Sequence, residues 1–439
     1  MIPGLIIAAP ASGSGKTVLT LGLLAHLAHT GHKVASAKAG PDYIDPAFHT
    51  QATERACLNM DPWAMRPETL AGAAQLLSDN ADIIIGEGVM GLFDGAFVRE
   101  GDNDGSTAEL SRLTGWPVIL VIDARAQAAS AAAVLKGFAE FRDGVTIAGV
   151  VYNRTGGERH NDILKSASAA ALPDIPVLGC LPRTAGLDLP ERHLGLVQAV
   201  EHPDLKGFLE TARALVARHV DVEKLLSLAK PLILGGSKSS PLPPLGQRIA
   251  IARDDAFAFT YDLTLSGWRD AGAEILPFSP LADEAPDNTA DAVFLPGGYP
   301  ELHAGTLSHA STFMDGLRGR AADGAAIYGE CGGYMVLGRG LVDGDGARHE
   351  MAGLLALETS FAERKLHLGY RQVRTLRESP LGAAGAAFRG HEFHYTGVIK
   401  EGPGNGLFAA ADAEGNDLEP MGLVDGRVAG SFVHLIDRE

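Results

Sequence analysis

Cys331 is the residue whose type and setting most clearly indicate chemistry. It lies in YGECGGYMVLG, residues 328–338, between an apolar run typical of a β-strand and a segment with helical spacing. At a strand-to-helix elbow of this kind a nucleophile is held exposed, the following backbone N–H can stabilise an oxyanion, and the helix N-terminus lowers the thiol pKa. The alternative is a small residue packed in a glycine-flanked turn.

A cysteine nucleophile needs a base and an oxyanion site, and the sequence supplies candidates for both. His434 lies at the end of an apolar stretch in GSFVHLID, and FLPGGYPEL contributes Gly297 and Gly298. We predict that Cys331 is the catalytic nucleophile and that His434 is its base. We also predict that Gly298 and Gly332 are the oxyanion residues.

A phosphate-binding loop is indicated near the N-terminus by AAPASGSGKT, which follows an apolar run and precedes a helical pattern. Glycine N–H groups can surround phosphate, a lysine adds positive charge, and a threonine hydroxyl reaches Mg²⁺. Pro10 stands where the common motif has its first glycine, and the alternative is a glycine-rich turn without a ligand. The residues that we predict to bind the nucleotide are Gly13, Ser14, Gly15, Lys16 and Thr17.

Three carboxylates lie at or after the ends of strands in the same half of the chain. Asp42 and Asp45 occur with Lys38 in KAGPDYIDPAFH, and Glu87 ends an apolar run in IIIGEGVMGLFDG. A P-loop fold presents its metal-binding acid at such a strand end. We predict that Thr17, Asp42 and Glu87 bind Mg²⁺, and the alternative for each acid is a solvated loop end or a helix cap.

Other polar residues and cysteines are weaker candidates. Asn153 ends a strand pattern in VVYNR, where its amide could read the adenine edge or simply form a turn. His391 and His394 in RGHEFHYTG have H-E-x-H spacing, one residue short of the zinc motif H-E-x-x-H, so we discount a metalloprotease. We expect Cys57 and Cys180 to lie in the core.

The pattern of apolar segments indicates an α/β protein with two domains. Runs such as GLIIAAP, ADIIIGEG and PVILVIDA alternate with helical stretches, which is typical of a parallel sheet covered on both faces. Proline, glycine and serine dominate a stretch after residue 230, and the alternation then resumes. We predict a domain over residues 1–230, a linker over 231–245 and a second domain over 246–439.

The composition restricts the partners of the chain. Its 439 residues carry a formal net charge of −17, which argues against a duplex nucleic-acid partner. No apolar run approaches the ~20 residues that a membrane-spanning helix requires. Three widely spaced cysteines do not suggest a disulfide framework, and we expect a cytoplasmic protein. The sequence leaves a homodimer open.

The later motifs resemble class I glutamine amidotransferase domains, which have a G-x-C-x-G elbow, a preceding P-G-G loop and a late histidine. Ile436 occupies the position at which that family usually has an acid, two residues after the histidine. One branch of the family lacks this acid and is fused to a P-loop synthetase domain. The whole chain, including GPDYIDP as its most specific segment, resembles the cobyrinate and hydrogenobyrinate a,c-diamide synthases of cobalamin biosynthesis.

The resemblance implies an N-terminal P-loop domain of the dethiobiotin-synthetase type and a C-terminal class I glutamine amidotransferase domain. The first would use MgATP to phosphorylate a corrin carboxylate, with Asp45 assisting substrate activation or ammonia attack. The second would release ammonia from glutamine through a Cys331 thioester. Substrate contacts are expected from Lys38, Tyr43, His391 and His394. For the two histidines, a contact between the domains is a second interpretation, and core packing is the alternative to both.

Alternative functions remain open at this point. Nickel sirohydrochlorin a,c-diamide synthases are close relatives that use a related macrocycle. A P-loop ATPase with a non-catalytic second domain would keep the nucleotide motifs but hydrolyse no glutamine, and a cysteine hydrolase or acyltransferase would not use ATP.

Overall fold

The computed structural model describes residues 2–187, 189, 191–192, 195–196, 198–235, 239–402 and 405–439, with the backbone alone for 191–192 and 195–196. Two compact units are present, one made of residues 1–63, 70–96 and 102–238, and the other of 64–69, 97–101 and 239–439. The predicted linker includes residues 236–238, which lie outside the described residues.

The first unit contains an eight-stranded sheet in the order β3-β2-β4-β1-β5-β6-β7, with β10 paired antiparallel to β1. All other strand pairs in this sheet are parallel. A separate two-stranded sheet joins β8 and β9. The strands are β1 Pro3–Ala8, β2 Val34–Ala39, β3 Leu58–Met60, β4 Ile83–Glu87, β5 Val118–Asp123, β6 Ile147–Thr155, β7 Val177–Pro182, β8 Glu191–Arg192, β9 Gly195–Leu196 and β10 Lys230–Pro231.

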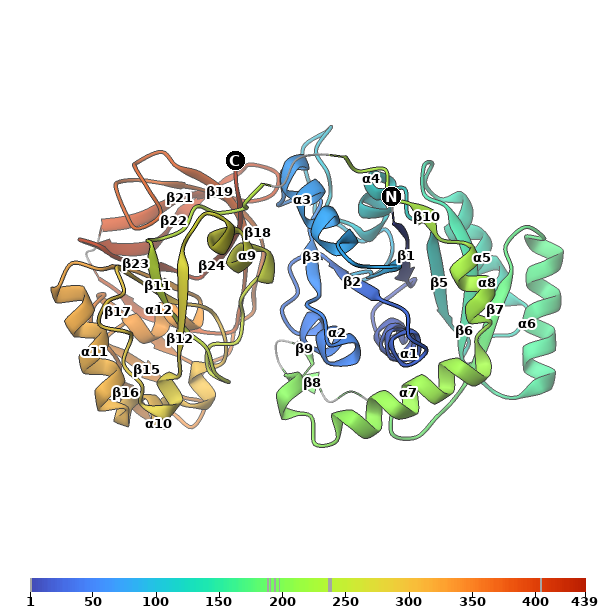
Figure 1. Cartoon of the computed structure of the whole chain (residues 1–439), viewed down its shortest axis with the longest axis horizontal. Coiled ribbons are helices and arrows are strands. Elements are labelled where there is room, and N and C mark those ends of the chain that lie inside the picture. Colours follow the sequence, from blue (N-terminus) through green and yellow to red (C-terminus); the bar gives the residue numbers. More distant parts are fainter. Residues whose placement is uncertain are drawn as a thin grey trace. The chain divides into compact units, whose positions relative to one another are not determined.

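Helices connect the strands of the first unit, and apolar side chains of α1 and α7 pack in one buried cluster with β1, β4 and β5. Figure 1 shows α1 and α7 next to each other in this unit, and the two helices are in contact. The helices are α1 Lys16–His29, α2 Asp45–Thr53, α3 Pro67–Ser78, α4 Thr107–Thr114, α5 Ser130–Glu140, α6 Glu158–Ala171, η1 Ala199–Glu201, α7 Leu205–His219 and α8 Val222–Ser227; most of α3 belongs to this unit.

The second unit contains a ten-stranded sheet in the order β12-β11-β13-β14-β23-β22-β21-β18-β19-β24 and a four-stranded sheet in the order β16-β15-β17-β20. The pairs from β12 to β23 are parallel, and the remaining pairs of the large sheet are antiparallel. The strands are β11 Arg248–Ala252, β12 Glu274–Phe278, β13 Ala292–Leu295, β14 Ala326–Glu330, β15 Gly340–Val342, β16 Arg348–Glu350, β17 Leu357–Ser360, β18 His367–Thr375, β19 Ala387–His394, β20 Gly397–Glu401, β21 Asn405–Ala411, β22 Asp417–Asp425, β23 Val428–Ser431 and β24 Val433–Arg438.

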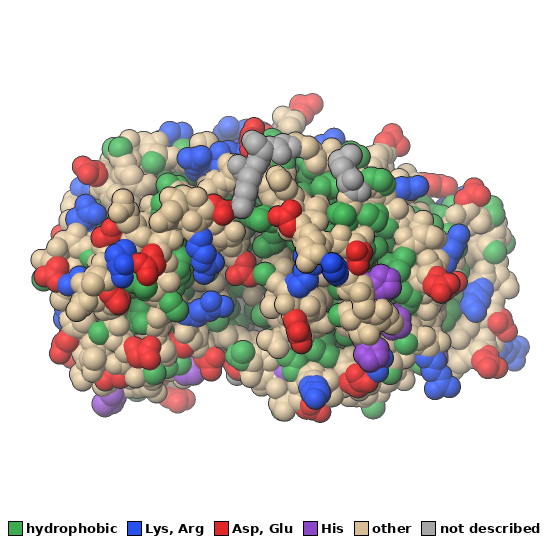
Figure 2. Space-filling model, in the orientation of Figure 1, with side chains coloured by type: hydrophobic (Ala, Val, Ile, Leu, Met, Phe, Trp, Pro, Cys, Tyr) green, Lys and Arg blue, Asp and Glu red, His purple; other side chains and the backbone are tan. Residues whose placement is uncertain are grey.

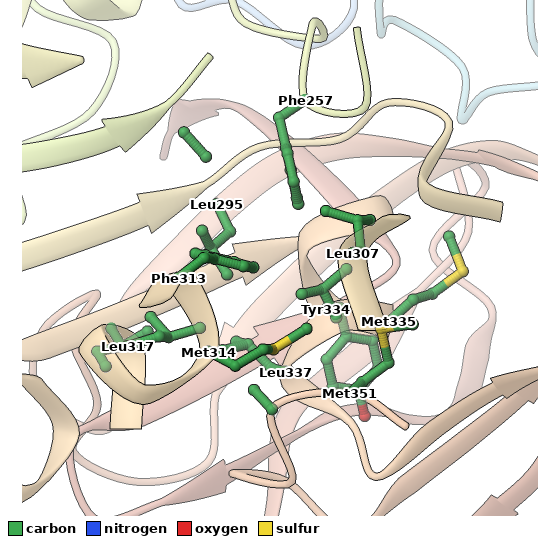
Figure 3. Close-up of a cluster of buried hydrophobic side chains, with 14 of the residues drawn as sticks. Phe257, Leu295, Leu307, Phe313, Met314, Leu317, Tyr334, Met335, Leu337 and Met351 are labelled. Carbon is green, nitrogen blue, oxygen red and sulfur yellow. The ribbon is translucent and has the colours of Figure 1, made fainter. Parts of the chain in front are cut away.

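A buried apolar cluster holds the helix that follows Cys331 in the second unit. Figure 3 shows Tyr334, Met335 and Leu337 of this helix among Leu295 and Phe313 from neighbouring elements. Full burial of such side chains stabilises the fold by about 1.5–3 kcal/mol each. The helices of this unit are α9 Asp262–Asp270, η2 Pro280–Ala282, η3 Pro300–Leu302, α10 Ala304–His309, α11 Ser311–Ala322 and α12 Gly332–Leu337.

The α/β class and the parallel sheet of the N-terminal part are therefore confirmed. Figure 2 shows basic and acidic side chains interspersed over the visible face, with apolar side chains between them. None of the helices in the described part of the chain has the length and apolar character of a membrane span.

Candidate active sites

The phosphate loop of the first unit lies between β1 and α1, as the sequence predicts. Gly15 has a φ of 96°, in the left-handed region that favours glycine. A Cβ on this residue would lie only 2.1 Å from Nδ2 of Asn153, which donates a hydrogen bond to the Ser14 carbonyl at 2.9 Å. Arg154 donates to the Gly13 carbonyl at 2.7 Å. Asn153 thus supports the loop from β6, a role that the sequence did not indicate.

Lys16 is the first residue of α1, and its side chain is almost fully buried. Its Nζ donates a hydrogen bond to the Met90 carbonyl at 2.6 Å. Burial lowers the pKa of Lys16, and the positive charge of Lys38 acts in the same direction. The ammonium group therefore lies in a place where an anionic phosphate would be a favourable partner.

Thr17 and Glu87 meet although 70 positions separate them in the sequence. The Thr17 hydroxyl donates to Oε1 of Glu87 at 2.7 Å, and Glu87 ends the buried strand β4. Hydroxyl and carboxylate oxygens are the hard donors that Mg²⁺ prefers. These two residues therefore fit a magnesium site.

Lys38 lies at the centre of the predicted acidic residues. Its Nζ donates to Asp45 and, at 3.3 Å, to Oε1 of Glu87, and it lies 3.9 Å from Oδ2 of Asp42. Burial alone would lower the pKa of Lys38, but Asp45 and Glu87 raise it above its ordinary value. Lys38 therefore carries the charge that allows Asp45 and Glu87 to be buried together.

The three acids differ in their surroundings. Burial and the neighbouring Asp42 raise the pKa of Asp45, whereas Lys38 and His49 hold the pKa of Glu87 below its ordinary value despite burial. Asp42 accepts hydrogen bonds from the backbone N–H of Ile44 and Asp45 at 2.7 and 3.2 Å, so it also organises the loop before α2. The partly exposed Tyr43 lies in the same loop.

His49 is a residue of this site that the sequence analysis missed. It is fully buried, its Nε2 lies 2.8 Å from Oε2 of Glu87, and its Nδ1 lies 3.4 Å from Sγ of Cys57. Cys57 is buried, as predicted, but it takes part in this series of polar contacts through its contact with His49. The spacing of Asp45 and His49 places them one helical turn apart, which could have revealed His49.

Cys331 lies at the strand-to-helix elbow between β14 and α12 of the second unit. Its φ of 46° and ψ of −101° are strained for a residue with a side chain, and its N–H donates to the Ser431 carbonyl at 2.8 Å. The expectation of an exposed thiol with a lowered pKa is wrong. Cys331 is buried, and burial together with the nearby Glu301 raises its thiol pKa, while α12 is only six residues long.

The two predicted oxyanion residues lie close together. A Cβ on Gly332 would be 3.1 Å from the backbone nitrogen of Gly298. Gly332 is the first residue of α12, and Gly298 follows β13, the strand next to β14 in the sheet. Their proximity to each other and to Cys331 fits a pair of backbone donors at the elbow.

His434 is brought into the same region by the chain that follows β23. Ser431, which accepts the hydrogen bond from Cys331, ends β23, and β24 begins two residues later. A Cβ on Gly297 would lie 2.4 Å from Cε1 of His434, so only glycine fits beside this ring. Burial lowers the pKa of His434 and keeps the imidazole neutral, as a proton acceptor must be.

Glu330 is the second site residue that the sequence analysis missed. Its Oε2 lies 3.8 Å from Nδ1 of His434, and its Oε1 accepts a hydrogen bond from the backbone N–H of Leu435 at 3.1 Å. Ile436, at the position of the usual family acid, is a buried apolar residue. The residue directly before the nucleophile therefore brings a carboxylate to the histidine.

The histidines of β19 lie in the second unit near this cluster. The His391 ring is stacked on the His434 ring with 4.9 Å between centroids, and its Nε2 lies 3.0 Å from the Tyr261 hydroxyl. Burial lowers the pKa of His391 to about 3. The neutral ring of His391 thus packs directly against the candidate base.

His394 takes part in a separate ion-pair network. Its Nε2 lies 2.8 Å from Glu392, which also pairs with Arg371 at 2.7 Å. His367, Glu392 and His394 offer ligand-type atoms within 4.8 Å of one another. The rings of His367 and His394 are stacked in parallel, however, and Arg371 already neutralises the carboxylate, so this network does not fit a metal ion.

Two family models match the two halves of the chain. Residues 5–197 match a CobQ/CobB/MinD/ParA nucleotide binding domain, and residues 248–439 match a CobB/CobQ-like glutamine amidotransferase domain. The first match contains the phosphate loop, and the second contains Cys331 and His434.

The chain is also similar over almost its full length to curated proteins. It is 53% identical over 438 residues to the hydrogenobyrinate a,c-diamide synthase of Rhizobium meliloti, covering 99% of both chains. It is 52% identical over 437 residues to the protein of the same name from Brucella anthropi, covering 99% of this chain and 98% of that protein.

Proposed function

Since this chain belongs to the family of hydrogenobyrinate a,c-diamide synthases, we propose that it converts the a and c side-chain carboxylates of a corrin ring into amides, using ATP and glutamine, in cobalamin biosynthesis. The observation that carries the proposal is the presence, on one chain, of a phosphate loop next to a Thr17–Glu87 pair and of a cysteine elbow near a buried histidine. A ligase that also hydrolyses glutamine needs both.

The chemistry explains why two sites are required. A carboxylate does not accept ammonia until one of its oxygens becomes a leaving group. Transfer of the γ-phosphoryl group of ATP to that oxygen gives an acyl phosphate and ADP. Ammonia then adds to the carbonyl carbon, loses a proton, and inorganic phosphate leaves with the electrons of the C–O bond.

The residues of the first unit are assigned to the synthetase reaction. Lys16 and the N–H groups of the loop bind the phosphates of ATP, and Thr17, Glu87 and Asp42 hold Mg²⁺, which neutralises phosphate charge when bound. Asp45, kept in place by Lys38, assists substrate activation or ammonia attack. Tyr43, in the loop before α2, is assigned to the macrocycle.

The residues of the second unit are assigned to glutamine hydrolysis. His434 accepts the Cys331 proton, and the sulfur adds to the side-chain amide carbon of glutamine. The N–H groups of Gly298 and Gly332 stabilise the oxyanion. His434 returns the proton to the leaving nitrogen, which releases ammonia and a thioester, and water then hydrolyses the thioester to glutamate.

This assignment gives the chain a synthetase domain over residues 1–230 and a glutaminase domain over 246–439. The three cysteines are free and buried, which suits a reducing compartment, and we place the enzyme in the cytoplasm. Its partners are then small molecules, namely the macrocycle, glutamine and ATP.

The proposal is tested by offering the purified protein glutamine, MgATP and one macrocycle at a time. Hydrogenobyrinate is expected to show the mass change of two OH groups replaced by NH₂, dependent on both glutamine and ATP. Cobyrinate and nickel sirohydrochlorin are the comparison substrates, and conversion of nickel sirohydrochlorin in preference to hydrogenobyrinate would reassign the substrate. Glutamine hydrolysis with no amidation of any of the three would overturn the proposal.

A further inference from the structure

We propose that Glu330 is the positioning acid of His434, taking the part that an acid two residues after the histidine plays in related amidotransferases. The inference rests on the proposed glutaminase reaction. It concerns how the base is oriented and how its positive charge is stabilised after it takes the Cys331 proton.

The position of the Glu330 carboxylate supports this role. One oxygen is fixed by the backbone N–H of Leu435, the residue after the base, at 3.1 Å. The other oxygen faces Nδ1 of His434 at 3.8 Å. At this distance the two groups are not hydrogen-bonded, and they form an ion pair only when His434 is protonated. Contacts of this kind in catalytic sites often shorten when substrate binds. With Nδ1 on the carboxylate side, Nε2 is the nitrogen that would receive the thiol proton.

Two other acids of the second unit have partners of their own. Asp437, the acid nearest to His434 along β24, accepts hydrogen bonds from the Arg66 guanidinium at 2.9 and 3.1 Å. Glu392 pairs with Arg371 and His394. Glu330 is buried, and its carboxyl group contacts the His434 ring.

Other residues of the pocket hold the His434 ring in place. His391 stacks on one face of His434, and Gly297 lies against Cε1. Burial raises the pKa of Glu330 to about 8, so the carboxyl group ionises at mildly alkaline pH. In its ionised form the Glu330 carboxylate, 3.8 Å from Nδ1, would stabilise the imidazolium that forms when His434 takes the thiol proton.

The experiment measures glutamate release from glutamine by the full-length enzyme with its macrocycle and MgATP. Glu330→Gln keeps the size of the side chain and an oxygen for the Leu435 N–H, but removes the negative charge. We expect kcat to fall on the order of 10²-fold with little change in KM for glutamine. Glu330→Asp is expected to recover part of the loss, and Glu358→Gln, in a partly exposed pair with Arg348, serves as the matched control with unchanged kinetics.

Two further measurements separate the possible failures. Amidation driven by ammonium should be unchanged in Glu330→Gln, which shows that the variant is folded, and alkylation of Cys331 by iodoacetamide should slow. A kcat and an alkylation rate equal to those of the wild type would overturn the role of Glu330. A wild-type enzyme that releases no glutamate would instead overturn the proposed function, whatever the variant does.

Discussion

The hydroxyl of Thr17 lies 2.7 Å from Oε1 of Glu87, so the start of the first helix and the end of β4 present two oxygens to one point. β1 and β4 are neighbouring parallel strands, and their carboxyl ends lie at the same edge of the sheet. The topology therefore brings together a residue at the start of α1 and a residue at the end of β4 that are far apart in the sequence. Lys38 donates a hydrogen bond to the same oxygen of Glu87 at 3.3 Å, and Nε2 of His49 lies 2.8 Å from the other oxygen, Oε2.

Lys16→Ala is expected to abolish amidation of the macrocycle with either glutamine or ammonium as the nitrogen source. The ammonium group of Lys16 is buried beside the phosphate loop, and free ammonia could not replace the contact with phosphate that we propose for it. Product mass with each nitrogen source is the measurement. Unimpaired amidation by the variant contradicts the assignment of the loop.

Glu87→Gln, Asp45→Asn and Asp42→Asn should each lower synthetase turnover by about 10²-fold or more, because each removes charge from the site that we propose for phosphate transfer. Glutamine hydrolysis should fall much less. Glu140→Gln, on the exposed end of α5, is the control and should keep full turnover. Wild-type rates in all three acid variants would mean that these residues only shape loops.

Gly15→Ala should weaken ATP binding and lower amidation with both nitrogen sources. The new Cβ would lie 2.1 Å from Asn153 Nδ2, at a backbone φ of 96° that costs an alanine about 1–2 kcal/mol. Gly137→Ala is the matched control, because its Cβ would meet no atom within 4 Å. Calorimetric titration with ATP measures the effect, and equal affinities of the two variants would be inconsistent with a tight loop.

Much of this arrangement could be predicted from the sequence, because local patterns carry it. Apolar runs mark the strands, and glycine with lysine and threonine marks the phosphate loop. Asp42, Asp45 and Glu87 were placed correctly at one edge of a sheet, since parallel strands present their carboxyl ends together. Cys331 was expected at a strand-to-helix elbow and lies there.

The parts that were missed depend on tertiary packing. Glu330 follows the pattern of an ordinary strand end, and only the pairing of β14 with β23 and the return of β24 bring it to His434. The burial of Cys331, and therefore its raised pKa, follows from side chains of several elements. The contact of Asn153 with the Ser14 carbonyl of the loop was also missed, because a strand-end position indicated only an adenine contact or a turn.

The buried Glu330 should make the stability of the enzyme depend on pH. Its pKa of about 8 in the folded state exceeds the ordinary value, so between these two values the folded state keeps a proton that the unfolded chain has released. Stability should therefore fall as the pH rises through this window, up to about pH 8. Glu330→Gln should reduce that fall. Thermal unfolding midpoints of both proteins across the window measure it, and parallel curves would contradict the raised pKa.

The most direct test of the whole account compares product mass from Cys331→Ser with glutamine and with ammonium chloride at mildly alkaline pH. Serine preserves the elbow but replaces the thiol with a much weaker nucleophile, so glutamine-dependent diamide formation should vanish. Ammonium should restore it, because ammonia from solution can react with the activated carboxylate. His434→Ala should behave in the same way, with some residual glutaminase activity. Full glutamine-dependent amidation by Cys331→Ser would contradict the account and reduce Cys331 to a small residue in a turn.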